Sequence, residues 1–163
     1  MTRTVAVESV RPKKFVPVGK PTPVPVICKG DDVTAEWLTL MFRFRQWLGP
    51  DGTVDEIKTK SIGEGQGEYG DLMAVEVVRA TNAPDNLPKY MIAKMCPQRA
   101  AMPKMVLKGI YLNEAHFYND FSIDGGALIR PECYHVAANL KAKWPQFCFM
   151  LEVGICLSDS CSQ

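Results

Sequence analysis

Two charged residues stand in patterns that otherwise belong to a protein interior. Lys94 lies in the apolar run 90–95, where the alternation of a strand places it on the same face as Ile92. Glu114 lies inside an apolar helical stripe, where an acid is costly unless it meets a cation. We therefore expect a Lys94–Glu114 ion pair. The alternatives are a strand-end lysine that reaches water and an acid at the edge of the stripe, beside Asn113.

A glycine-rich turn precedes these two residues. Residues 63–70 lie between two strand-like stretches, and their glycines are Gly63, Gly65, Gly67 and Gly70. Backbone N–H groups in such a turn can approach phosphate oxygens with no side chain in the way. No Walker sequence or helix follows, and the next element reads as a strand rather than as the helix of a dinucleotide fingerprint. The alternative is a hairpin whose glycines serve only the turn.

A short apolar strand completes the series of signals. Residues 147–151 are uncharged and apolar, and Leu151 and Glu152 stand at their end. The main chain at such a strand end emerges at the rim of a sheet, where its polar groups could read the edge of a base. By itself, Glu152 is the first polar residue after a core strand.

Composition and charge exclude several classes of function. The chain has 163 residues, of which 47% are hydrophobic and 23% charged, as in a soluble protein with one domain of ordinary size. Its net charge of +1 provides no general attraction to nucleic acid or to an acidic membrane. Its apolar runs fall far short of the ~20 residues that a spanning helix needs. We expect neither a nucleic acid nor a membrane as partner.

The cysteines and histidines do not form a metal-binding pattern. The chain has six cysteines without CxxC spacing, and its two histidines, His116 and His135, do not join them in a zinc pattern. No export signal supports disulfides. We expect six reduced thiols, no bound metal and a cytoplasmic location.

The elements that must position these residues follow from the remaining patterns. Residues 1–30, rich in proline and in basic side chains, predict a disordered tail. Apolar side chains at helical spacing from Val33 to Leu48, ended by Gly49 and Pro50, predict an amphipathic helix of about four turns.

Five strands and a second helix are expected after this first helix. The helical region spans about residues 100–121 and falls between the third and the fourth strand. The strand patterns cover residues 54–62, 72–80, 88–95, 132–138 and 146–153. This order predicts an α+β fold with a five-stranded antiparallel sheet and an inserted helix.

In this order the signals resemble the N-terminal lobe of protein-kinase-like folds. The local sequence motifs are most similar to those of the CHK and ecdysteroid-kinase-like branch of the aminoglycoside/choline phosphotransferase superfamily. The resemblance covers about Val33 to Glu152, and the lobe that it predicts spans residues 31–153. Its segments are Ser61 to Asp71, Leu87 to Lys94, Glu114 to Tyr118, Arg130 to Tyr134 and Phe149 to Glu152.

The resemblance implies a role for each signal. The glycine turn would cover the phosphates of ATP, Lys94 would hold its α- and β-phosphates, and Glu114 would orient Lys94. Leu151 and Glu152 would belong to the hinge that faces the adenine. The family transfers the γ-phosphoryl group to a hydroxyl of a small molecule, and the resemblance does not identify that acceptor.

The chain also departs from the family pattern. Val153 stands where the family usually has an acid, and residues 154–163 form an irregular tail. No His-x-Asp loop with a downstream Asn follows, and no later Asp for magnesium. We therefore expect an ATP-binding lobe that ends at the hinge, with a weak or incomplete ATP site, no catalytic residue of its own, and Mg²⁺ only if a second lobe were present.

Two other functional classes stay open. The chain could be a non-enzymatic interaction module derived from a kinase N-lobe, with a protein partner covering its open cleft face. It could also be an unrelated α+β domain in which the glycines, Lys94 and Glu114 are only structural.

Overall fold

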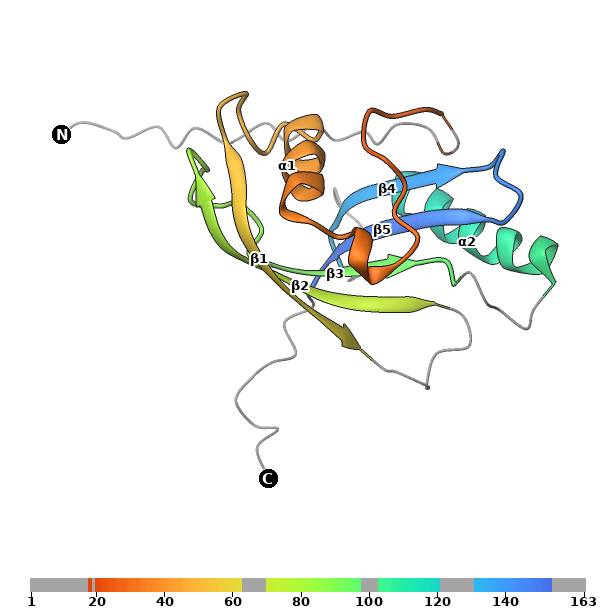
Figure 1. Ribbon diagram of the computed structural model, residues 1–163. Coiled ribbons are helices and arrows are strands. Elements are labelled where there is room, and N and C mark those ends of the chain that lie inside the picture. Colours follow the sequence, from red (N-terminus) through yellow and green to blue (C-terminus); the bar gives the residue numbers. More distant parts are fainter. Residues whose placement is uncertain (1–17, 19, 63–69, 98–102, 121–130, 154–163) are drawn as a thin grey trace.

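The computed structural model describes residues 18, 20–62, 70–97, 103–120 and 131–153. Their main feature is a five-stranded antiparallel sheet with the strand order β1-β2-β3-β5-β4 (Figure 1). The predicted α+β class and the five-stranded antiparallel sheet are thereby confirmed. The strands are β1 (Thr53–Ile62), β2 (Asp71–Thr81), β3 (Tyr90–Met95), β4 (Cys133–Asn139) and β5 (Gln146–Glu152).

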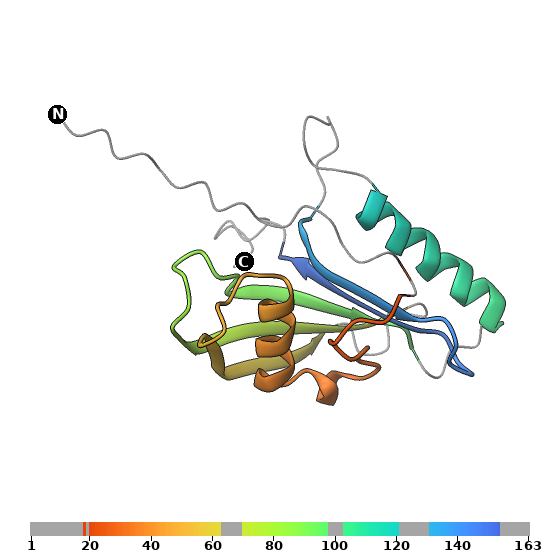
Figure 2. The same cartoon turned by 90° about the horizontal axis from the view of Figure 1, so that it is seen from above.

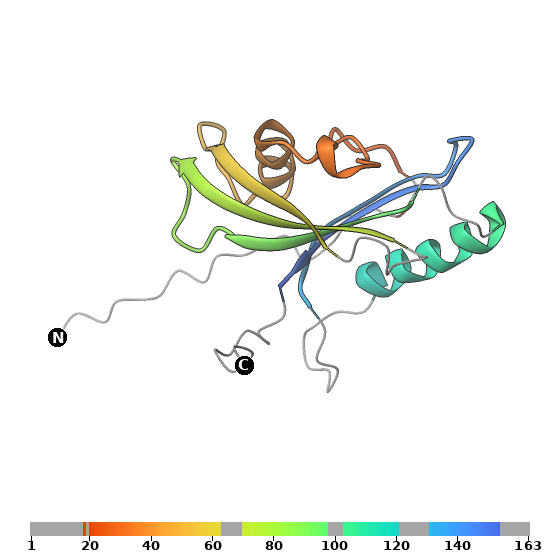
Figure 3. The same cartoon turned by 60° about the horizontal axis from the view of Figure 1, so that its bottom comes forward.

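Two α-helices cover opposite faces of this sheet. Helix α1 (Ala35–Phe44) follows a short 3-10 turn, η1 (Gly30–Asp32), and lies on one face, whereas α2 (Lys104–Asp120) lies on the other (Figure 3). Seen from above, α1 lies over β1 and β2, and α2 runs beside β4 and β5 (Figure 2). The molecule therefore has two hydrophobic cores, one under each helix.

Side-chain alternation in β5 divides its residues between the two cores. Cys148 and Met150 pack in the core under α1, and Phe147 and Phe149 pack in the core under α2. All four are 1% exposed or less. A strand that is buried on both faces reads as a continuous apolar run, which is why the sequence pattern marks β5 clearly.

Helix α1 ends earlier than the sequence predicts. Thr34 caps its start, since its hydroxyl oxygen accepts a hydrogen bond from the Trp37 N–H at 3.1 Å. Its end is a Schellman motif: the N–H of Trp47 donates to the Phe42 carbonyl at 2.8 Å, and Gln46 has a left-handed φ of 58°. The helix thus stops at Phe44 and not at the expected Gly49–Pro50 pair. A left-handed glutamine gives no signal in the sequence.

Part of the expected disordered tail is packed against the domain. Val24 and Ile27 are 1% and 2% exposed and belong to the core under α1. The indole Nε1 of Trp37 donates to the Pro25 carbonyl at 2.9 Å. The tail prediction is therefore wrong for residues 20–30, because two apolar side chains among the prolines find a place in the core. Residues 1–17 and the expected irregular tail, 154–163, lie outside the described residues.

Helix α2 and the cysteines agree with the sequence patterns where they are described. The helix begins at Lys104 and extends to Asp120, within the expected region. Cys28, Cys96, Cys133 and Cys148 are free thiols, and Cys156 and Cys161 are outside the described part.

In the part of the chain that is described, no helix has both the length and the apolar character needed to cross a membrane.

Candidate functional site

The expected ion pair joins the central strand β3 to α2. The Nζ of Lys94 lies 2.8 Å from Oε1 and 2.7 Å from Oε2 of Glu114. The two side chains remain 28% and 21% exposed. Each therefore loses part of its hydration, and the pairing offsets that cost. The predicted Lys94–Glu114 contact is confirmed.

Tyr111 of α2 contacts Lys94 of this pair and is itself hydrogen-bonded to β3. Its ring centroid lies 5.6 Å from the Lys94 ammonium, and its hydroxyl donates to the Met95 carbonyl at 3.0 Å. Burial, first of all, raises the pKa of Tyr111, so the phenol stays protonated and remains a donor. The sequence pattern places Tyr111 only in the apolar stripe. Its spacing of three residues before Glu114 is the signal that could have assigned it to the site.

The last glycine of the turn lies directly against the pair. A Cβ on Gly70 would be 3.0 Å from the Tyr111 hydroxyl and 3.5 Å from the Cε of Lys94. The main chain can pass this close to the Tyr111 and Lys94 side chains because glycine has no side chain of its own. Gly63, Gly65 and Gly67 lie outside the described residues, so their place relative to Lys94 is not described.

Apolar side chains surround Lys94 on the same face of the sheet. Directly paired residues of antiparallel strands point to one side, and Ile62 pairs with Leu72, which pairs in turn with Lys94. In the same way Ile92, two residues before Lys94, pairs with Leu151. Leu72, Ile92 and Leu151 are half-buried, and Ile62 is 39% exposed.

Two members of this surface, Ile62 and Leu72, were not among the residues that the sequence predicted for the site. Each is an ordinary strand residue, and only the cross-strand register brings it next to Lys94. Their strands pair on either side of the glycine turn, which is the signal that could have found them. The resulting surface has a cation at one end and an apolar floor beside it.

Glu152 holds the end of β5 to the start of β4. Its N–H donates to the Glu132 carbonyl at 2.7 Å, and its Oε2 accepts from the Glu132 N–H at 3.0 Å. Glu152 thus stands at the rim of the sheet, as expected for the strand end. Its N–H and carboxylate are engaged within the protein, so a bound base would meet other main-chain groups of this segment.

Comparison with known proteins identifies no relative of this chain. No family model, curated protein or solved structure matches the chain. The function therefore has to be argued from the site alone.

The arrangement suits an anion that carries a flat apolar group. A lysine ammonium has three donors, and an ammonium held by one carboxylate can still donate to an anionic oxygen. The half-buried apolar surface beside it offers area for a base or a ring. No three His, Cys, Asp or Glu side chains gather as metal ligands within residues 20–62, 70–97, 103–120 and 131–153.

Proposed function

We propose that this chain binds a nucleotide as the ATP-binding lobe of a small-molecule phosphotransferase resembling the CHK and ecdysteroid-kinase-like proteins. One observation carries the proposal. Lys94 is fixed by both carboxylate oxygens of Glu114 at the edge of an apolar sheet face, with Gly70 against its side chain.

The geometry supports phosphate binding because the Lys94 ammonium is already held in place. A lysine that is free to move loses side-chain entropy when it binds a phosphate, whereas Glu114 already holds the Lys94 ammonium in place. The approach of Gly70 leaves room for the main chain near the same anion. Ile92 and Leu151 would form the floor under the base. Phosphoryl transfer itself would also need a side chain that accepts the proton of the acceptor hydroxyl, and ligands for Mg²⁺. The proposal assigns neither of these roles to the described residues.

Titration of the full chain with the fluorescent nucleotide mant-ATP tests the proposal. We expect saturable binding, and a loss of about tenfold in affinity in Lys94→Met, which removes the charge and keeps the length of the side chain. The matched control is Lys89→Met, because Lys89 is 59% exposed and its ion pair with Glu76 is long, at 3.9 Å. Absence of binding by the native chain, or equal affinity in Lys94→Met, would contradict the proposal.

A second candidate function is an interaction module, and exposed apolar side chains favour it. Tyr90 is 54%, Ile62 39% and Val78 38% exposed. Tyr90 and Ile62 lie on the face that carries Lys94, as their strand positions show. A protein partner would cover them. Sedimentation analysis separates the two functions: a chain that binds no mant-ATP but self-associates, and loses that association in Tyr90→Ser, would support the module.

A cytoplasmic location belongs to this proposal as well. Burial raises the pKa of Cys96 and of Cys148 to about 12. Both groups therefore remain protonated thiols at neutral pH and react slowly with oxidants. The four described cysteines are also free of disulfides, as is usual for proteins of a reducing compartment.

A further inference from the structure

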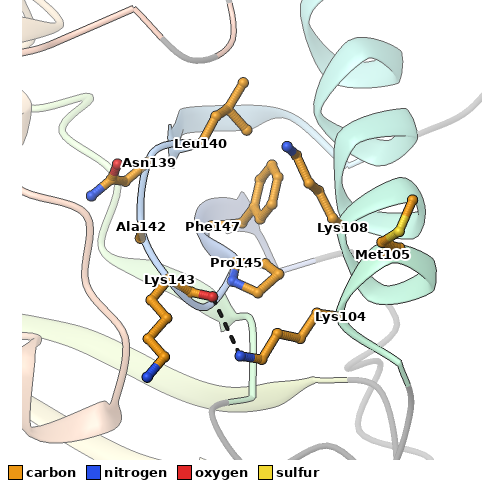
Figure 4. Close-up of a pocket in the computed structure, with 9 residues that line it drawn as sticks. All are labelled: Lys104, Met105, Lys108, Asn139, Leu140, Ala142, Lys143, Pro145 and Phe147. Atoms are coloured by element: carbon orange, nitrogen blue, oxygen red, sulfur yellow. Dashed lines mark hydrogen bonds between the residues drawn. The ribbon is translucent and has the colours of Figure 1, made fainter.

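A separate cavity lies between the start of α2 and the hairpin that joins β4 to β5. Its volume is about 110 Å³, and apolar side chains of the hairpin, including Leu140, Pro145 and Phe147, contribute to its wall (Figure 4). From Lys108 to Glu114 the helix advances about 9 Å, so the cavity is distinct from the candidate nucleotide site.

The charge at this cavity has one sign. Lys104, Lys108 and Lys143 line it together with six uncharged residues, and no acid is among the lining side chains. Lys104 and Lys108 are four residues apart and therefore lie on one side of the helix. In Figure 4 the Lys108 side chain reaches over the cavity toward the hairpin, and the Lys143 side chain points away from it.

Lys104 is held at the mouth of the cavity by the hairpin. Its Nζ lies 4.8 Å from the ring centroid of Trp144 and donates to the Lys143 carbonyl at 3.4 Å. Trp144 is fixed in turn, since its Nε1 donates to the Pro97 carbonyl at 2.9 Å. The side chains at the mouth of the cavity are thus held in place without a ligand, which lowers the entropy cost of binding one.

The second ammonium at the mouth has no such anchor. The Lys108 side chain is exposed and makes no hydrogen bond or ion pair with any other residue that the structure describes. The Lys108 ammonium therefore stands at an apolar wall without a counter-charge among the described residues, although the chain as a whole has a net charge of only +1. An organic anion would supply that charge and fill the cavity.

We propose that this cavity binds a small organic carboxylate with a branched apolar group of about four carbons. The size follows from the volume, because a cavity of about 150 Å³ accommodates benzene and this one is smaller. The carboxylate would meet the Lys108 ammonium, which reaches toward the hairpin apart from the Lys104 ammonium, with the apolar group against Phe147.

The test is an NMR titration of the ¹⁵N-labelled full chain with isovalerate, a branched four-carbon group on a carboxylate. We expect saturable shifts of amides in residues 104–108 and 139–147. Lys108→Met should weaken binding about five- to tenfold, and Lys141→Met, which changes an exposed lysine outside the cavity lining, should leave it unchanged. Ala142→Leu should abolish binding without a change of charge, because it fills the cavity from the hairpin.

Three results would overturn the proposal. Equal affinity for the neutral isovaleramide would remove the role of the Lys108 ammonium. Equal shifts with inorganic phosphate would reduce the cavity to a charge-only surface. Equal loss in Lys108→Met and Lys141→Met would assign the effect to general charge. Binding of mant-ATP is measured independently, so failure here leaves the nucleotide proposal untouched.

Discussion

Both carboxylate oxygens of Glu114 lie within 2.8 Å of the Lys94 ammonium, although each side chain keeps more than a fifth of its surface exposed. This partial exposure permits two roles that are usually separate. The pair fastens α2 to the sheet, and the ammonium remains open to a second anion. Substitutions can separate the two roles.

A charge exchange should restore the first role and not the second. Glu114→Gln alone is expected to lower the free energy of unfolding by about 1–3 kcal/mol, between the values for exposed and buried pairs. The exchange of Lys94→Glu with Glu114→Lys should recover most of that stability in urea unfolding, because an ion pair forms again. Its affinity for mant-ATP should stay low, since the cation has moved to the helix. An exchanged protein that binds as well as the native chain would contradict the assigned role of Lys94.

Gly70→Ala should weaken nucleotide binding through crowding. Its Cβ would stand 3.0 Å from the Tyr111 hydroxyl, which is tied to the Met95 carbonyl and so cannot yield without losing that bond. We expect a loss of severalfold in mant-ATP affinity. Gly109→Ala is the matched control, because its Cβ would meet no atom within 4 Å apart from its chain neighbours and the adjacent backbone of its own helix. This second change should leave affinity unchanged and raise the free energy of unfolding by about 0.5–1 kcal/mol, as expected inside a helix.

Gln46→Gly should stabilise the protein. Gln46 holds a φ of 58°, which costs a residue with a Cβ about 1 kcal/mol and glycine very little. The hydrogen bonds of the Schellman motif are made by the main chain and would be kept. Urea unfolding should therefore show a higher midpoint with an unchanged slope. A lower midpoint would show that the Gln46 side chain makes a contact that outweighs the backbone cost.

His135 should make the fold sensitive to acid. Burial, followed by the nearby Arg45 guanidinium, lowers the pKa of His135 to about 3, and its Nε2 makes no hydrogen bond with the described residues. The unfolded chain binds this proton near pH 6.5, so it holds more protons than the native state between about pH 6.5 and 3. Stability should fall across that window as the pH decreases, by up to about 1.4 kcal/mol per pH unit.

The measurement compares the native chain with His135→Leu in urea unfolding from pH 7.5 to 4.5. The slope of stability against pH should be smaller in the variant. His116→Gln is the control, because it removes the other histidine of the chain, which is exposed on α2. Equal slopes in the native chain and in His135→Leu would refute the prediction.

The parts that the sequence predicted correctly depend on patterns that are local. β5 is buried on both faces, and its apolar run shows this without reference to any other element. The Lys94–Glu114 pair could be predicted because each charge stood alone in an apolar pattern, and a buried charge needs a partner. No detailed geometry was needed for either inference.

The parts that could not be predicted depend on distant residues. Leu72 reaches Lys94 only through the register of β2 with β3, and the register of β1 with β2 shifts between Val54 and Ile57. Val24 and Ile27 look like members of a proline-rich tail until the core under α1 supplies a place for them. The cavity at Lys108 depends on how closely a helix approaches a hairpin, and no spacing of residue types reports that distance.

The alternation in β5 has a consequence for how the protein unfolds. Phe149 packs in the core under α2, and its neighbours Cys148 and Met150 pack in the core under α1. Neither core can therefore unfold without exposing β5 residues that belong to the other core. Unfolding should therefore be a single cooperative transition rather than the loss of one helix at a time. The amides of β3 and β5 would exchange with solvent only in that global event, and their exchange rates would report the stability of the whole domain.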